Sequence, residues 1–194
     1  MVKVIIITGT PGTGKTTLAK LICETTNSKL FEINSIVIQN EFFEDWDEER
    51  NVPIVNNEKI FLFFQDYLKS SSDEKIIIVE GHYFEFIPEG LIDKIVILRS
   101  YPSILKQRLI NKNFNDLKIN ENVQAEILGS IMGIVIDKYS KISLLQVDTS
   151  DMSIENSKNL ILNFIEDRIP STNQSEYIDW LPILEEKKEL DSYF

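Results

Sequence analysis

The chain has 194 residues, and its composition and charge exclude several classes of protein. A formal net charge of −11 argues against non-specific binding to nucleic acids, which depends on a basic surface. The single cysteine, Cys23, excludes a disulfide framework and favours a reducing, cytoplasmic compartment. No apolar run reaches the roughly 18 residues of a membrane helix, and the first apolar run begins too early for a signal peptide to precede it. We therefore expect one globular domain in the cytoplasm, without a membrane segment.

Taken in order, the sequence alternates between short apolar runs and amphipathic patterns. Residues 2–7 are apolar and β-branched, as expected of a strand buried within a parallel sheet. Runs of the same character follow at residues 29–33, 75–79, 94–98 and 143–147. Helices are expected between them, over residues 15–24, 57–69, from 102, over 120–139 and from 153. Such alternation predicts an α/β fold in which helices cover both faces of a parallel sheet.

The segment between the first run and the first helix is rich in glycine. Residues 9–16, GTPGTGKT, fit the pattern G-x-x-x-x-G-K-[ST] of a phosphate-binding P-loop. Between a strand and a helix, backbone N–H groups, here including those of Gly12, Thr13 and Gly14, converge on phosphate oxygens. Lys15 is then expected to reach the β- and γ-phosphates of ATP, while the Thr16 hydroxyl binds Mg²⁺. A chance glycine-rich turn is the alternative that this setting disfavours.

Glu80 and His82, which follow the apolar run at residues 75–79, are candidates for the same site. Glu80 follows residues 77–79 at the carboxyl end of the predicted strand, where an acid is expected to hold the Mg²⁺ shell through water. The alternative is a carboxylate that merely faces solvent. His82, the only histidine, lies two residues further on. It is either a structural residue or a group that orients a water molecule or a phosphate oxygen, and both possibilities stay open.

Cations further along the chain are candidates for contacts with the transferred phosphoryl group. Arg108 and Lys112 are four residues apart and therefore lie on one face of a helix. Two cations on one face can clamp phosphoryl oxygens in a closed state. The alternative is a solvated helix charge, and Arg99, at the end of the 94–98 run, is a less favoured third candidate.

Three segments interrupt the alternation of strands and helices. Residues 34–55, here called the insert, contain an acidic patch over 41–49, and residues 111–120 are polar. In a P-loop protein, such excursions beyond the strand ends are where a second substrate and a lid are expected. After a main domain over residues 1–168, residues 169–194 form a C-terminal appendage. It either packs onto its own core, which we favour, or engages a partner.

Short motifs beyond the phosphate loop are more specific than the loop itself. They are DEER at 47–50 before PIV at 53–55, VEGH at 79–82, VILR at 96–99, RL at 108–109 and ENVQAEI at 121–127. Together with Thr10-Pro11 and Thr17-Leu18, they resemble the adenylate kinase isoenzyme 6 family, an archaeal and eukaryotic group also described as coilin-interacting nuclear ATPases. The resemblance covers about residues 2–168, and IDWL at 178–181 is similar to the tails of archaeal members.

The resemblance implies a three-layer P-loop NTPase fold like that of nucleoside monophosphate kinases, with five parallel strands. It also implies phosphorylation of AMP or another nucleoside monophosphate by ATP, a requirement for Mg²⁺, and an ATPase activity tied to small-subunit ribosome assembly. The insert matches the monophosphate-binding region, and about residues 111–121 match the lid. The positions that match the family's ATP-binding loop are Gly12, Gly14, Lys15, Thr16 and Thr17.

The sequence departs from the family pattern at three positions. Lys112 replaces a lid arginine; lysine keeps the charge but loses the bidentate fork, which predicts weaker ATP binding or slower turnover. Ile38 occupies the position that we align with an arginine of the monophosphate-binding helix, so residues 34–49 contain no basic residue. Glu80 replaces the aspartate of eukaryotic members and is longer, but it can serve the same metal shell.

The leading hypothesis is therefore an ATP:AMP phosphotransferase in which Lys15 holds ATP while Arg108 and Lys112 close over it. An assembly factor switched by ATP hydrolysis is a second hypothesis, favoured by the missing basic residues and by His82 beside Glu80. Its partner would be a basic small-subunit ribosomal protein, which suits an acidic surface. A small-metabolite kinase on the same core is a third.

Overall fold

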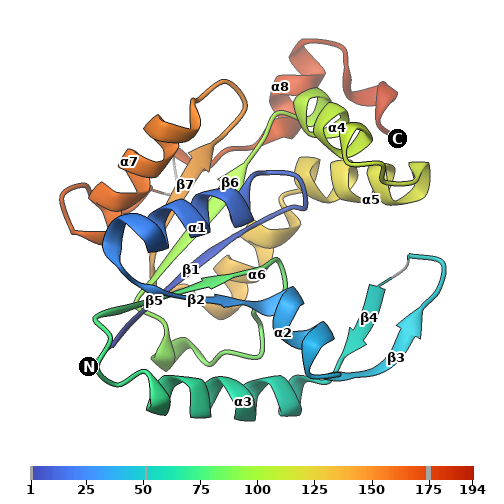
Figure 1. Cartoon of the computed structure of the whole chain (residues 1–194). Coiled ribbons are helices and arrows are strands. Elements are labelled where there is room, and N and C mark those ends of the chain that lie inside the picture. Colours follow the sequence, from blue (N-terminus) through green and yellow to red (C-terminus); the bar gives the residue numbers. More distant parts are fainter. Residues whose placement is uncertain (1, 51, 174–175) are drawn as a thin grey trace.

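The computed structural model describes residues 2–50, 52–173 and 176–194, and a five-stranded parallel sheet forms its centre (Figure 1). The strands are β1 (Lys3–Gly9), β2 (Lys29–Glu32), β5 (Ile76–Glu80), β6 (Lys94–Arg99) and β7 (Ser143–Asp148). Their order in space is β2-β5-β1-β6-β7, and every neighbouring pair is parallel. Each strand lies within two residues of the run that predicted it, since strands buried on both faces are continuous apolar runs.

Helices cover both faces of this sheet, as the alternation of patterns predicts. Successive side chains of a strand point to opposite faces. Ile6 packs in a core cluster with residues of α3 (Asn57–Ser70) and α6 (Ser130–Lys138). Ile5 and Ile7 pack in a second cluster with residues of α1 (Lys15–Thr26) and α7 (Ile154–Ile165). The expected three-layer α/β fold is therefore confirmed.

The remaining elements extend from the ends of the sheet. They are α2 (Ile33–Gln39), the antiparallel hairpin of β3 (Phe43–Asp47) and β4 (Val52–Val55), α4 (Pro102–Asn111), α5 (Asp116–Ile127), α8 (Trp180–Glu186), and 3₁₀ turns at Glu89–Leu91 and Leu190–Ser192. The side chains of Asn56, Asn115 and Ser153 cap the amino ends of α3, α5 and α7. No helix in residues 2–50, 52–173 and 176–194 is long and apolar enough to cross a membrane.

The prediction of one long helix over residues 120–139 is wrong. The structure has two helices there, α5 and α6, and α5 already begins at Asp116. Gly129 separates them in the left-handed conformation, with φ of 63°. The break follows from packing: Val123 and Ile127 face the cluster under the appendage, whereas Met132 and Val135 face the main core. The polar stretch expected as a lid forms the end of α4, a short turn and the start of α5.

The C-terminal appendage packs onto the core of its own chain. Trp180 and Leu184 of α8 are buried, and they form one apolar cluster with Leu105 and Leu109 of α4 and with residues of α5. Figure 1 shows α8 beside α4, at the same end of the sheet as the phosphate loop. The sequence favours packing of the appendage onto its own core over engagement of a partner, and the structure shows that packing.

Candidate active site

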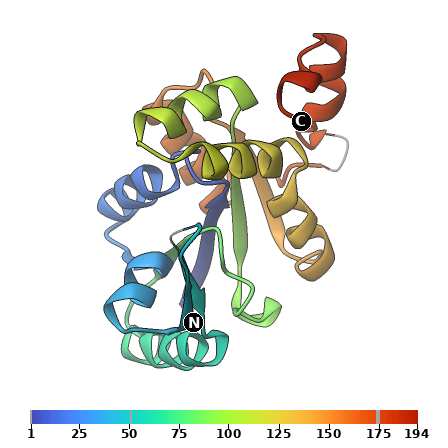
Figure 2. The ribbon, with the colours of Figure 1, turned by 90° about the vertical axis from the view of Figure 1, so that its right-hand side faces the viewer.

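A cavity of about 800 Å³ lies beyond the carboxyl ends of the central strands, where open parallel sheets bind their ligands. The phosphate loop and α1 form one wall, and the hairpin and α2 form another. The hairpin, which connects α2 to α3, extends toward the side of the molecule on which α5 lies (Figure 2). The predicted site residues that line the cavity are Gly12, Gly14, Lys15, Thr16, Thr17, Glu80, His82 and Lys112.

The backbone of the phosphate loop requires glycine at specific positions. Gly9 has φ of 142°, and a Cβ there would lie 2.3 Å from the carbonyl oxygen of Leu98. Gly14 has φ of 100° and precedes α1, and a Cβ on it would meet no atom within 4 Å. Because Gly14 lines the cavity, the missing side chain leaves open space beside the helix amino end. This cradle fits a phosphate group.

The amine of Lys15 is buried at the base of the cavity, where it donates a hydrogen bond of 3.2 Å to the carbonyl oxygen of Thr10. Burial lowers the pKa of Lys15 to about 8, while the carboxylates of Glu80 and Glu126 act in the opposite direction. A poorly solvated ammonium group gains more from pairing with a phosphate than a hydrated one does. The location agrees with the role predicted from the sequence.

Thr16 and Glu80 lie side by side, although they are far apart in sequence. The parallel pairing of β1 with β5 places Glu80 opposite Ile7, just before the phosphate loop begins. The Thr16 hydroxyl donates a hydrogen bond of 3.3 Å to a carboxylate oxygen of Glu80. Burial raises the pKa of Glu80, and the charge of Lys15 partly offsets this effect. A hydroxyl beside a carboxylate at a phosphate cradle is a donor set that fits Mg²⁺.

His82 faces the same cavity. His82 is exposed along the cavity, yet the protein atoms around its imidazole disfavour the charged form and, with the charges of Lys15 and Lys118, lower the pKa of His82 to about 4. The imidazole is therefore neutral at pH 7. A neutral ring has both a donor and an acceptor nitrogen, so it can orient a water molecule.

The structure does not bring every predicted residue to the cavity. Among the described residues, Thr13 and Arg108 are not part of the lining. Arg108 donates hydrogen bonds to the Thr149 hydroxyl at 3.1 Å and to the Thr149 carbonyl oxygen at 2.5 Å. The same Thr149 hydroxyl lies 3.1 Å from the carbonyl oxygen of Thr13, to which it donates. Arg108 thus contacts the phosphate loop through Thr149.

Sequence reasoning missed two cations of this site, Arg50 and Lys118. Arg50 lies between β3 and β4 and is the one basic residue of the insert, a signal that the sequence did contain. Its guanidinium contacts Asp47 at 3.1 Å and Glu121 at 2.7 Å, and Lys118 donates to its carbonyl oxygen at 3.0 Å. These contacts connect the insert to α5 across the mouth of the cavity.

Comparison with known proteins agrees with this geometry. A family model described as AAA domain matches residues 5–129. An adenylate kinase isoenzyme 6 homolog of Caenorhabditis elegans is 33% identical over 154 residues, which are 78% of this chain and 84% of that protein. A homolog of the same description from Dictyostelium discoideum is 31% identical over 170 residues, 87% of this chain and 95% of the relative. The chain belongs to the adenylate kinase isoenzyme 6 family.

A solved structure supports the fold of this family member. Deoxyadenosine kinase from M. mycoides superposes with a TM-score of 0.56 at 15% identity, covering 84% of this chain and 99% of that one. The likeness concerns the fold alone. The three residues at which the sequence is expected to depart from the family pattern, Ile38, Glu80 and Lys112, all line the cavity.

Proposed function

We propose that this protein is an ATP:AMP phosphotransferase. The observation that carries the proposal is one cavity shared by the phosphate loop and the insert, which gives a donor and an acceptor nucleotide a common space. The names of its relatives support it. In the reaction an oxygen of the AMP phosphate forms a bond to the γ-phosphorus of ATP while the bond to the β–γ bridging oxygen breaks, giving two ADP. No general base is needed, since the AMP phosphate is already anionic at neutral pH.

On the donor side, the loop amides at Gly12 and Gly14 and the ammonium of Lys15 would hold the triphosphate. Thr16 and Glu80 would hold Mg²⁺, which when bound neutralises phosphate charge. Lys112 lines the cavity and would contact the transferred group directly. We assign Arg108 an indirect role, because its hydrogen bonds to Thr149 keep it at the back of the phosphate loop.

On the acceptor side, we assign Arg50 to the AMP phosphate. Ile38 cannot provide the positive charge expected from the family pattern, and Arg50 is the one basic residue of the insert. It lines the cavity, and its partners Asp47 and Glu121 hold it with exposed contacts that a phosphate can replace. Lys118 adds a second positive charge on the same side. In this proposal Arg50 provides the positive charge that the insert lacks at Ile38.

The decisive experiment measures ADP formation from Mg²⁺ and ATP with and without AMP, with Lys15→Ala as the inactive control. We expect ADP formation to depend on AMP and to be abolished in the variant. Replacing AMP with CMP, UMP or GMP in the same assay shows which nucleoside monophosphate accepts phosphate fastest. Failure of every nucleoside monophosphate to accept phosphate would contradict the proposal and favour a small-metabolite kinase. Wild-type rates in Lys15→Ala would contradict the site assignment.

Neutral His82 in the cavity favours hydrolysis of ATP as a second activity. The imidazole can orient a water molecule in place of the acceptor phosphate. Slow release of ADP and phosphate without AMP, reduced in His82→Ala, would support this activity. A basic ribosomal protein as the partner of an ATP-switched assembly factor stays a prediction; the net charge of −11 suits such a partner.

We also propose a cytoplasmic location. Cys23 is a free and buried thiol, and burial raises its pKa to about 11. An unreactive thiol of this kind is typical of proteins in a reducing compartment. Fractionation of the native cells with an antibody against the protein tests this location.

A further inference from the structure

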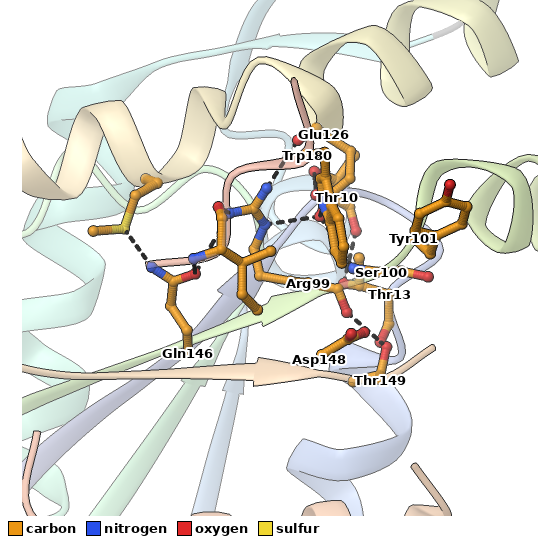
Figure 3. A network of polar contacts seen from close by, with 12 residues as sticks. Thr10, Thr13, Arg99, Ser100, Tyr101, Glu126, Gln146, Asp148, Thr149 and Trp180 are labelled. Atoms are coloured by element: carbon orange, nitrogen blue, oxygen red, sulfur yellow. Dashed lines mark hydrogen bonds and ion pairs between the residues drawn. The ribbon is translucent and has the colours of Figure 1, made fainter. Parts of the chain in front are cut away.

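Two residues to which the proposed reaction assigns no role, Glu126 and Trp180, meet in one buried network (Figure 3). Glu126 belongs to the motif at residues 121–127, and Trp180 to the motif at 178–181. The Glu126 side chain is 2% exposed, and the Trp180 indole N–H donates a hydrogen bond of 3.1 Å to its carboxylate. A carboxylate with so little access to water is stable only when its oxygens are well paired. The position of the Glu126 carboxylate therefore depends on the groups that donate hydrogen bonds to it.

The partners of Glu126, itself in α5, come from three other parts of the chain. One carboxylate oxygen accepts from the Arg99 guanidinium at 2.8 Å, from the Ser100 amide at 3.0 Å and from Trp180. The other oxygen accepts from the Thr10 hydroxyl at 2.6 Å. The end of β6, the phosphate loop, α5 and the appendage thus meet at one charged group, here called the Glu126 cage. Figure 3 shows the side chains of Thr10, Arg99 and Trp180 gathered around it.

The appendage closes this cage with its backbone as well as with its indole. Arg99 donates a hydrogen bond of 2.9 Å to the carbonyl oxygen of Ile178. The amide of Ile178 in turn donates to Gln146 at 3.1 Å. If the appendage left, Glu126 would lose one donor and Arg99 one acceptor, and water would reach both charges. The position of the carboxylate therefore depends on the docked appendage.

The other end of the cage reaches the phosphate loop. The Thr10 hydroxyl is held by Glu126, and the Thr10 carbonyl oxygen accepts hydrogen bonds from the Thr13 amide and from the Lys15 amine, both at 3.2 Å. One residue thus connects the carboxylate to the amine that binds phosphate. The negative charge of Glu126 also raises the pKa of Lys15 against the effect of burial.

We propose that Glu126 is a positioning residue for the phosphate loop and that the docked appendage sets its carboxylate through Trp180. Nucleotide binding at the loop and docking of the appendage are then coupled, and the coupling acts equally in both directions. This inference rests on the part of the proposed function that places a nucleotide at the phosphate loop. It does not depend on which acceptor the enzyme uses.

The test is a double-mutant cycle on the affinity for the non-hydrolysable ATP analogue AMPPNP with Mg²⁺, measured by calorimetry. Thr10→Val removes the hydroxyl, and Trp180→Phe removes the indole N–H; both keep most of the side-chain volume. Each change is expected to raise Kd about fivefold or more, the lower end of typical coupling between sites. Because both act through Glu126, the double variant is expected to match the weaker-binding single variant.

Two controls separate positioning from general destabilisation. Thr10→Ser keeps the hydroxyl and is expected to keep Kd within about twofold of the wild type. Phe164→Leu lies in the separate cluster with α1 and α7, so it should lower the melting temperature and leave Kd unchanged. Fold increases that multiply in the double variant, or single variants with wild-type Kd, would overturn the proposal.

A measurement on the wild type keeps the proposal testable if Trp180→Phe does not fold. Reciprocity predicts that Mg²⁺ and AMPPNP slow amide hydrogen exchange in α8, and that Thr10→Val abolishes the effect. Unchanged exchange in α8 of the nucleotide-bound wild type would refute the coupling while leaving the proposed function intact. A wild type that does not bind AMPPNP at all would instead refute both, since the phosphate loop would then not be a nucleotide site.

Discussion

The guanidinium of Arg50 contacts the carboxylate of Glu121 through three hydrogen bonds of 2.7 to 3.2 Å. The pair joins the hairpin of the insert to α5. Its side chains are 46% and 36% exposed, and ion pairs this accessible contribute little to stability. The pair is therefore weak enough for an incoming phosphate to replace Glu121.

Arg50→Ala is expected to raise the KM for AMP by roughly tenfold, because the variant loses the charge-assisted hydrogen bonds to the phosphate. The KM for ATP should change little, since ATP is assigned to the opposite wall of the cavity. Steady-state kinetics, with AMP and ATP varied in turn, measures the two KM values separately. Lys69→Ala, which removes an exposed cation of α3, is the matched control. Equal increases in both KM values would contradict the assignment of Arg50 to the acceptor.

The affinity for ATP should depend on pH through Lys15. Its pKa of about 8 in the free protein means that the amine is mostly protonated at pH 7 and mostly neutral at pH 9. Only the protonated form pairs with phosphate, so affinity should fall above pH 8 by up to about tenfold per unit. Calorimetry at pH 7, 8 and 9 tests this, and binding near pH 8 should take up protons.

Lys112→Ala provides a second test of the pH dependence of the affinity for ATP. The charge of Lys112 lowers the pKa of Lys15, so its removal should move the midpoint of the pH profile upward. A midpoint that stays in place would show that the two cations do not interact. A flat profile in the wild type would contradict the buried environment of the Lys15 amine.

Glu80→Gln should increase the Mg²⁺ concentration needed for half-maximal ADP formation and reduce the maximal rate. The substitution keeps the shape of the side chain but removes the charge beside Thr16 that fits a divalent cation. Rates measured across a Mg²⁺ series at fixed ATP test the effect. Asp73→Asn removes an exposed carboxylate near the other end of β5 and should leave the series unchanged. An unaltered Mg²⁺ requirement in Glu80→Gln would place the cation elsewhere.

Leu184→Ala should lower the free energy of unfolding by about 2–5 kcal/mol, as expected for a fully buried leucine. Urea denaturation followed by circular dichroism measures the change. Ile136→Ala, at a side chain that is 50% exposed, should cost much less. If both substitutions had the same small effect, the appendage would not be packed onto α4 and α5 in solution.

Much of the fold could be predicted because the decisive patterns are local. The phosphate loop with its strand and helix occupies one continuous stretch, and each buried strand is a short apolar run. The break at Gly129 could not be predicted in this way. Apolar residues recur at helical spacing on both sides of it, and a glycine inside such a pattern is compatible with one helix or two. The choice is made by tertiary packing, since α5 contacts the appendage and α6 contacts the main core.

The residues of the candidate site also differ in whether a local sequence pattern determines their position. Lys15, Thr16 and Glu80 were predictable because their motif or strand end fixes their position. The Glu126 cage was not predictable, since Thr10 and Glu126 are 116 residues apart and neither motif indicates a hydrogen bond to the other. Arg108 shows the converse: it lies in the last turn of α4, Lys112 follows the end of that helix, and the Arg108 side chain pairs with Thr149.

The order of the elements along the chain, with Ile178 and Trp180 after β7, has a consequence for synthesis. The phosphate loop follows the first strand, β1, whereas the groups that complete the Glu126 cage are made after all five strands of the sheet. A nascent chain that ends before Ile178 has the whole loop but lacks two of the groups that fix Glu126 and Arg99. By the coupling proposed above, such a chain does not yet bind nucleotide tightly. Full affinity is then acquired only after residues 178–180 have been made.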